Sequence, residues 1–132
     1  RDLLSHRSGL SRGEMLWYYS TFDRQEILRR LRYLKPEAGF RSGFGYQNLM
    51  FVAAGEAVAA VAGKSWDAFV SEQFFVPLGM ASTTTSITTL GDNAAPPHAP
   101  LDGTFQPTAS PHVDNIAAAG AAHRPANDSS QS

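Results

Sequence analysis

Tyr46 and Asn48 are the two residues of this sequence whose types and spacing best suit chemistry. They follow a glycine-rich stretch and stand where a helix is expected to begin, so both side chains can project into one cleft. A tyrosine phenol can carry a proton in acyl transfer only if nearby cations lower its reference pKa of about 10. A carboxamide can donate and accept hydrogen bonds, which suits Asn48 to a substrate amide. The alternative is a buried tyrosine followed by an asparagine that caps the helix.

Other familiar patterns fail their own spacing rules. Residues 63–65 look like the end of a phosphate-binding loop, but Val58 stands where that loop needs a glycine. The four histidines lack the i, i+4 spacing of a helical zinc site. No metal site and no cofactor are therefore expected.

The composition is that of one small globular domain. The 132 residues are 42% hydrophobic and 17% charged, and the absence of cysteine excludes disulfides and thiol catalysis. A formal net charge of -1 supplies no basic face for nucleic acid. The longest weakly polar stretch, residues 49–63, is interrupted by Gly55 and Glu56 and is too short to cross a bilayer.

The first third of the chain is predicted to hold one complete helix. Residues 1–6 are expected to be the end of a preceding helix, with its leucines turned inward and Gly9 as the stop. Asp23 and Glu26 have the spacing of a capping box, and leucines and isoleucine then recur at helical spacing. That helix must end before Pro36.

Two further helices are predicted on either side of Gly63. The loop over residues 36–45 contains three glycines, which leave its backbone free to adopt positive φ. Residues 48–62 are rich in small side chains and predict a closely packed helix that ends at Gly63. Ser65 is expected to cap the helix that follows.

The chain changes character after residue 82. Six of the eight prolines lie in residues 83–125, which predicts an extended segment on the surface, with room for short strands. Residues 123–132 are polar and expected to be frayed. We therefore divide the single partial domain, residues 1–132, into a helical part, 1–82, and an extended part rich in proline and alanine, 83–132.

Five ordered blocks of sequence resemble the serine β-lactamase-related family of penicillin-binding-protein type. That family includes class C β-lactamases, D-alanyl-D-alanine carboxypeptidases and esterases. Residues 117–120 lack the proline of the family pattern, residues 121–125 fit it poorly, and the polar residues 129–132 stand where the family has an apolar helix. Residues 1–10 resemble its LLxHxSGL signature, residues 39–48 its pGxxxxYxN segment, residues 54–70 its following helices, residues 77–85 its PLGMxxT turn and residues 114–128 its DNxAPAG…SAxDM segment.

The resemblance implies a mainly α-helical fragment of the α/β β-lactamase/transpeptidase-like fold. In that fold a helical domain lies beside an antiparallel sheet domain, and the active site occupies the cleft between them. We expect this chain to be an internal part of such a protein, because it begins at Arg1 without a helix cap. Without the sheet domain, Leu49, Val52 and Ala53 are expected to be exposed and to promote aggregation.

The resemblance also assigns roles within the site. Tyr46 would be the catalytic general base, Asn48 would hold the polar side of a small-molecule acyl substrate and orient a lysine, and Gln47 would face solvent or the substrate rim. The family takes its nucleophile from S-x-x-K and a further strand from K-T-G or H-x-G, and this sequence contains none of them. His6 and Ser8, by contrast, are expected to be structural, with His6 bonding nearby backbone.

The sequence thus predicts an internal fragment of a serine hydrolase that acts on an ester, a β-lactam or a peptide amide through an acyl-enzyme, and that is inactive alone. The alternative is a non-catalytic protein, either a decayed copy or a binding module that keeps the helical scaffold. A third possibility is an unrelated helical domain that matches by chance. The sequence fixes no compartment, although a periplasmic or extracellular parent fits the resemblance.

Overall fold

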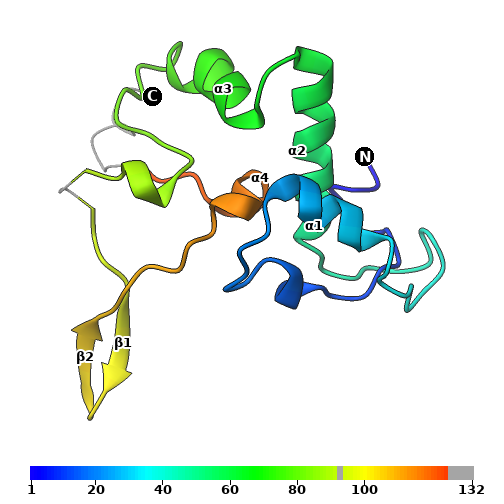
Figure 1. The fold of residues 1–132 in the computed structure, drawn as a ribbon, viewed down its shortest axis with the longest axis horizontal. Coiled ribbons are helices and arrows are strands. Elements are labelled where there is room, and N and C mark those ends of the chain that lie inside the picture. Colours follow the sequence, from blue (N-terminus) through cyan, green and yellow to red (C-terminus); the bar gives the residue numbers. More distant parts are fainter. Residues whose placement is uncertain (92–93, 125–132) are drawn as a thin grey trace.

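The computed structural model describes residues 1–91 and 94–124 and is mainly helical (Figure 1). The predicted frayed end, 123–132, lies outside this part except for its first two residues. Short 3-10 turns occur at Glu14–Leu16, Ile87–Thr89 and Asp114–Ile116. The helices are α1 (Arg24–Leu31), α2 (Leu49–Ala62), α3 (Trp66–Val70) and α4 (Ala117–Gly120), and a π-helical turn over Ser71–Phe75 extends α3. The strands are β1 (His98–Leu101) and β2 (Thr104–Pro107).

The main core lies between α1 and the first turn of α2. Ile27, Leu49 and Met50 are buried there. The predicted cap of α1 is confirmed, because the Asp23 carboxylate accepts a hydrogen bond from the Glu26 N–H at 2.8 Å. Partly buried side chains complete this core: Leu10, Leu16, Trp17, Phe22, Leu31 and Leu34.

The predicted ends of α2 and α3 are also confirmed. Gly63 ends α2 in the left-handed conformation, with φ at 66°, and the Ser65 hydroxyl accepts from the Ala68 N–H at 3.1 Å. Across the described residues no single helix is long and apolar enough to cross a membrane. Only α2 taken together with residues Trp66–Phe75 has the required length and composition, and the two are bent by 77°.

Residues 1–6 form turns, so the prediction of a helix end is wrong. Leu3 and Leu4 are 37% and 53% exposed instead of inward-facing. The cause is tertiary, because this segment runs beside the loop before α2 and binds its backbone. In that loop the positive φ belongs to Arg41, at 63°, and not to any of the glycines, and its guanidinium pairs with Asp2 at 2.7 Å.

The expected exposure of Leu49, Val52 and Ala53 is wrong as well. Leu49 and Val52 are buried within the chain itself and Ala53 is half-buried. The exposed apolar side chains of α2 lie in its second half, where Val61 is 91% exposed. The small residues of α2 pack against the chain's own later segment, which the periodicity of α2 alone does not reveal.

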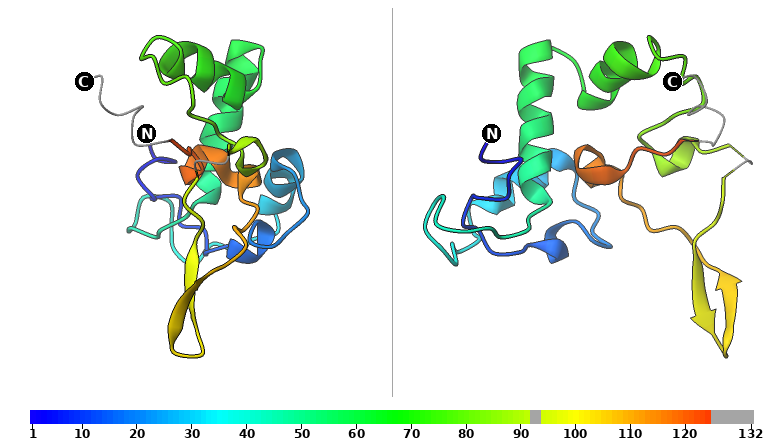
Figure 2. Two further views of the ribbon diagram at one scale, coloured as in Figure 1. Left: turned by 90° about the vertical axis from the view of Figure 1, so that its left-hand side faces the viewer. Right: turned by 180° about the vertical axis from the view of Figure 1, so that it is seen from behind.

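Residues 94–124 contain the short strands that were predicted and one helix that was not. β1 and β2 form an antiparallel hairpin in which Leu101 pairs with Thr104. Asp102 and Gly103 both have positive φ, the geometry of a tight type I′ turn. The hairpin projects away from the helices in both views of Figure 2, whereas α4 turns back and packs against α2.

Arg24 joins this later segment to the helical body. Its guanidinium binds the Asp67 carboxylate in a bidentate pair and donates to the Asp114 carbonyl at 2.9 and 3.2 Å. The Thr85 hydroxyl donates to the same carboxylate at 2.6 Å. Burial opposes ionisation of Asp67, but the hydrogen bonds from Arg24 and Thr85 outweigh it and keep the pKa of Asp67 below its ordinary value.

Replacement of Gly55 by alanine should destabilise the fold, because a Cβ there would lie 2.6 Å from the Ala118 Cβ and 3.2 Å from the Trp66 ring. The Ala118 Cβ is fixed to the backbone and has no side-chain torsion by which to move away, so α4 must shift. We expect Gly55→Ala to lower the free energy of unfolding by roughly 1–3 kcal/mol in chemical denaturation followed by circular dichroism. Gly43→Ala is the matched control, since no atom lies within 4 Å of its added Cβ. Equal stability of the two variants would contradict the α2–α4 contact.

Candidate active site

Tyr46 lies on the surface immediately before α2. It is 46% exposed, and its ring lies 4.6 Å from that of His6, centroid to centroid. The Arg12 guanidinium carbon lies 5.7 Å from the Tyr46 ring centroid, so a cation is present on one face of the ring. Within the described part of the chain the phenol oxygen has no hydrogen-bond partner. The phenol is therefore available to a ligand.

Gln47 points inward, so the prediction that it faces solvent or the substrate rim is wrong. It is only 1% exposed. Its amide nitrogen donates to the Ser11 carbonyl, and its amide oxygen accepts from the Leu49 N–H at 3.3 Å. These contacts satisfy one carbonyl in the preceding segment and one N–H in the first turn of α2. In this structure Gln47 holds the motif formed by residues 46–48 in place and cannot itself touch a substrate.

Asn48 is half-buried and precedes the first residue of α2 with helical backbone angles. Its side chain makes no capping hydrogen bond. The alternative interpretation of the sequence, a buried tyrosine followed by a capping asparagine, is therefore wrong on both points: Tyr46 is exposed and the Asn48 side chain does not cap α2. Tyr46 and Asn48 keep free polar groups on either side of a buried glutamine.

The segment 2–11 positions this motif by binding the loop 36–47 along its length. At one end, the Gly9 carbonyl accepts from the Glu37 and Ala38 N–H groups at 2.9 and 3.2 Å. Gly9 has a φ of 78°, and a Cβ there would lie 2.3 Å from the Ala38 carbonyl oxygen, so only glycine fits. The signature that resembles LLxHxSGL thus acts as a structural clamp on the motif loop.

The other end of the clamp lies at His6, as expected for a structural residue. Its Nδ1 accepts from the Gln47 N–H at 3.1 Å, and its carbonyl accepts from the Gly45 N–H at 2.9 Å. The Ser8 hydroxyl accepts from the Leu10 N–H at 3.3 Å and closes the intervening turn. The prediction that His6 bonds nearby backbone is confirmed.

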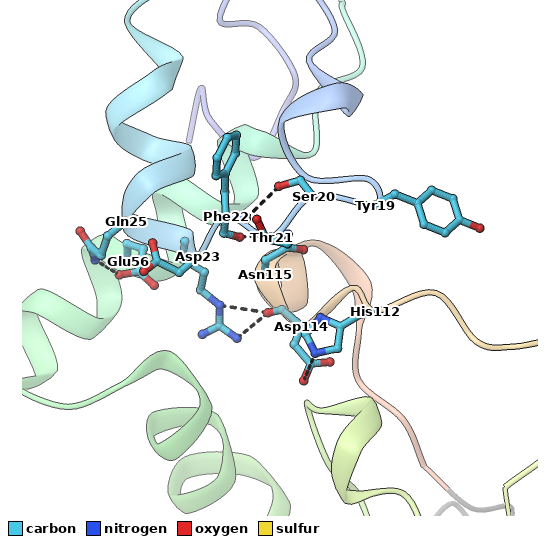
Figure 3. Close-up of a pocket in the computed structure, with 11 residues that line it drawn as sticks. Tyr19, Ser20, Thr21, Phe22, Asp23, Gln25, Glu56, His112, Asp114 and Asn115 are labelled. Atoms are coloured by element: carbon cyan, nitrogen blue, oxygen red, sulfur yellow. Dashed lines mark hydrogen bonds and ion pairs between the residues drawn. The ribbon is translucent and has the colours of Figure 1, made fainter.

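A separate cavity of about 770 Å³ lies between the start of α1, the middle of α2 and residues 112–115 (Figure 3). None of the three motif residues lines it. Two pairs of its lining residues bind each other: Gln25 donates to Glu56, and Arg24 donates to the Asp114 carbonyl. Among the described residues no group of three histidine or acidic side chains is arranged to hold a metal ion. No motif in the sequence points to this cavity.

Comparison with known proteins identifies the family. The Beta-lactamase family model matches residues 1–126. The chain is 34% identical over 91 residues to the unguisins hydrolase ungD' of Aspergillus campestris (strain IBT 28561), an alignment that covers 65% of this chain and 17% of that protein.

Solved structures show the same fold. The D-amino acid amidase from Ochrobactrum anthropi SV3, complexed with L-phenylalanine amide, is 27% identical with a TM-score of 0.77, over 96% of this chain and 39% of the amidase. The octameric penicillin-binding protein homologue from Pyrococcus abyssi is 19% identical with a TM-score of 0.78, over 98% of this chain and 32% of that one.

The chain belongs to the beta-lactamase family and has the β-lactamase/transpeptidase-like fold. The predicted family and fold class are therefore confirmed. Its relatives include proteins named as a hydrolase and as an amidase, and the chain spans only 17% and 39% of their respective lengths.

The opposite orientations of Tyr46 and Gln47 predict opposite effects on stability. Gln47→Ala leaves the Ser11 carbonyl and the Leu49 N–H without partners, and should lower the free energy of unfolding by roughly 1–3 kcal/mol. Tyr46→Phe removes a hydroxyl that binds no described residue and should change stability by less than about 0.5 kcal/mol. Urea unfolding of both variants measures the difference. A loss in Tyr46→Phe as large as that in Gln47→Ala would mean that the phenol oxygen is structural.

Proposed function

We propose that this chain forms the proton-carrying side of a serine hydrolase active site, with Tyr46 as general base and Asn48 as substrate-binding residue. The nucleophilic serine and its lysine come from an S-x-x-K motif in a part of the protein outside these 132 residues. In this proposal Gln47 has no contact with substrate. Because Gln47 is buried, its role is to hold Tyr46 and Asn48 in position.

The proposed reaction is acyl transfer in two steps. The serine oxygen attacks the carbonyl carbon while ionised Tyr46 accepts the serine proton, and the same proton then passes to the leaving amine or alcohol. Water attacks the resulting acyl-enzyme, again giving its proton to Tyr46, which returns it to the serine oxygen. The lysine ammonium supplies a cation that favours the ionised phenol, and Asn48 binds the polar side of the acyl group.

The observation that carries this proposal is the exposure of the Tyr46 phenol beside a buried Gln47. A tyrosine kept for packing would turn its ring into the core, where Leu49 and Met50 are available as neighbours. Here the ring stands 46% exposed, with Arg12 over one face. The free phenol of Tyr46 can transfer a proton, and the free carboxamide of Asn48 beside it can hydrogen-bond to an amide.

Amides are the substrate class that the relatives favour among the ester, β-lactam and peptide amide considered. One solved neighbour is named a D-amino acid amidase and is complexed with L-phenylalanine amide. We extend that chemistry to the complete protein that carries this chain. A carboxamide at Asn48 is suited to an acyl group with its own amide, because it can donate and accept at once.

The second candidate is a non-catalytic protein that keeps the helical scaffold. It is favoured by the absence of S-x-x-K, K-T-G and H-x-G from the 132 residues. The two candidates differ in the neighbouring coding sequence, where an in-frame S-x-x-K upstream supports the enzyme and its absence supports the scaffold.

The 132-residue chain alone should hydrolyse neither nitrocefin, p-nitrophenyl acetate nor D-phenylalanine amide, because it lacks the nucleophile. Purified chain is incubated with each compound, and release of product is compared with buffer and with heat-denatured chain. Turnover that survives repurification would contradict the assignment of the nucleophile to another segment. The complete protein should hydrolyse at least one of the three.

In the complete protein, Tyr46→Phe should lower kcat by a factor of about 10²–10⁴, the usual contribution of a positioned acid–base group. Because the phenol oxygen binds no described residue, the variant should remain folded. Tyr33→Phe is the matched control, since Tyr33 is an exposed tyrosine just after α1 and should keep full activity. Equal kcat values for the two variants would exclude Tyr46 as the base.

A further inference from the structure

His6 binds the backbone on both sides of Tyr46. Its carbonyl accepts from the Gly45 N–H at 2.9 Å, and its ring Nδ1 accepts from the Gln47 N–H at 3.1 Å. The reaction proposed above gives His6 no role. We infer that His6 is a positioning residue for Tyr46, and that it acts through a neutral ring with its proton on Nε2; this inference rests on the proposed function of Tyr46.

The tautomer follows from the hydrogen bond. A backbone N–H can only donate, so Nδ1 must present a lone pair to the Gln47 N–H, and the ring proton must lie on Nε2. The Gln47 N–H precedes α2 and has no carbonyl of that helix to bind. A protonated ring would place two N–H groups against each other and break this contact.

The ring contacts extend the same restraint to the side chain of Tyr46. The centroids of the His6 and Tyr46 rings are 4.6 Å apart with the planes tilted by 41°, within the range of favourable aromatic pairs. Phe51 and Phe44 lie 5.2 and 5.4 Å from the His6 ring. His6 is thus half-buried, and its ring lies beside the rings of Phe44, Phe51 and the proposed base, Tyr46.

The backbone of His6 makes this double contact possible. Its φ of 55° lies in the left-handed region, which few residues other than glycine adopt. In this conformation the carbonyl and the ring bind the chain at Gly45 and Gln47. Tyr46 is therefore bracketed by two hydrogen bonds from one residue, and its ring packs on that residue's ring.

The tautomer is tested by nuclear magnetic resonance on the 15N-labelled 132-residue chain at neutral pH. Long-range 1H–15N correlations should show His6 Nε2 bearing hydrogen and Nδ1 unprotonated. His98, which is exposed on β1 and whose Nδ1 donates to the Pro96 carbonyl at 2.9 Å, provides the internal reference for the opposite tautomer. A hydrogen on His6 Nδ1 would overturn the inference.

The positioning role is tested in the complete protein with His6→Ala and His6→Asn. We expect His6→Ala to lower kcat by about 10- to 100-fold with KM unchanged, as for a small misplacement of a reacting group. His6→Asn should recover part of the loss, because its side-chain oxygen can accept from the Gln47 N–H and asparagine tolerates positive φ. His98→Ala is the matched control and should keep full kcat.

Four outcomes separate this inference from a structural role and from failure of the proposed function. Wild-type kcat in folded His6→Ala, with Tyr46→Phe impaired, refutes the positioning role alone. A loss in His6→Ala that appears only as less folded protein, with kcat per folded molecule unchanged, also refutes it. Full activity of Tyr46→Phe removes the proposed function and this inference with it. Should His6→Ala not fold, a kcat of His6→Asn equal to wild type counts against the ring contact and a reduced one supports it.

Discussion

The hydrogen-bonded pairing between residues 2–11 and the loop 36–47 is the constraint on which the site depends. It fixes a long loop that has no secondary structure of its own, at several points from Gly9 to His6. A loop of this kind would otherwise sample many conformations, and the cost of ordering it is met before any substrate arrives. Tyr46 and Asn48 are therefore preorganised by residues 2–11, a segment in which no residue is proposed to react.

The same pairing explains why the helix expected over residues 1–6 does not form. A helix would satisfy its own backbone groups, but here the carbonyls of His6 and Gly9 serve the motif loop instead. His6 and Gly9 both have positive φ, which no helix contains. Local propensity is overridden by long-range backbone hydrogen bonds, and a sequence read in short windows does not contain that information.

Features that depend on local chemistry could be predicted from the sequence. The caps at Asp23 and Ser65 and the stop at Gly63 follow from side chains that satisfy nearby backbone groups, or from tolerance of positive φ, and each is present. The hairpin could have been placed with more precision, since Asp102-Gly103 is a strong type I′ turn signal. α4 could not, because four small residues carry no periodicity and owe their position to Gly55 on α2.

Gln47 shows how much of the candidate site can be predicted from the sequence. Alternation along Tyr46, Gln47 and Asn48 suggests that the middle side chain faces away from the outer two, but the sequence does not say which face is solvent. The answer depends on the Ser11 carbonyl, 36 residues earlier, which needs a donor that a glutamine at this position can supply. A position without a chemical role can thus be more restricted by folding than the reactive positions beside it. The free energy that holds the motif comes from Gln47 and its bonded neighbours, and this leaves the Tyr46 phenol unengaged at the surface, as a proton carrier requires.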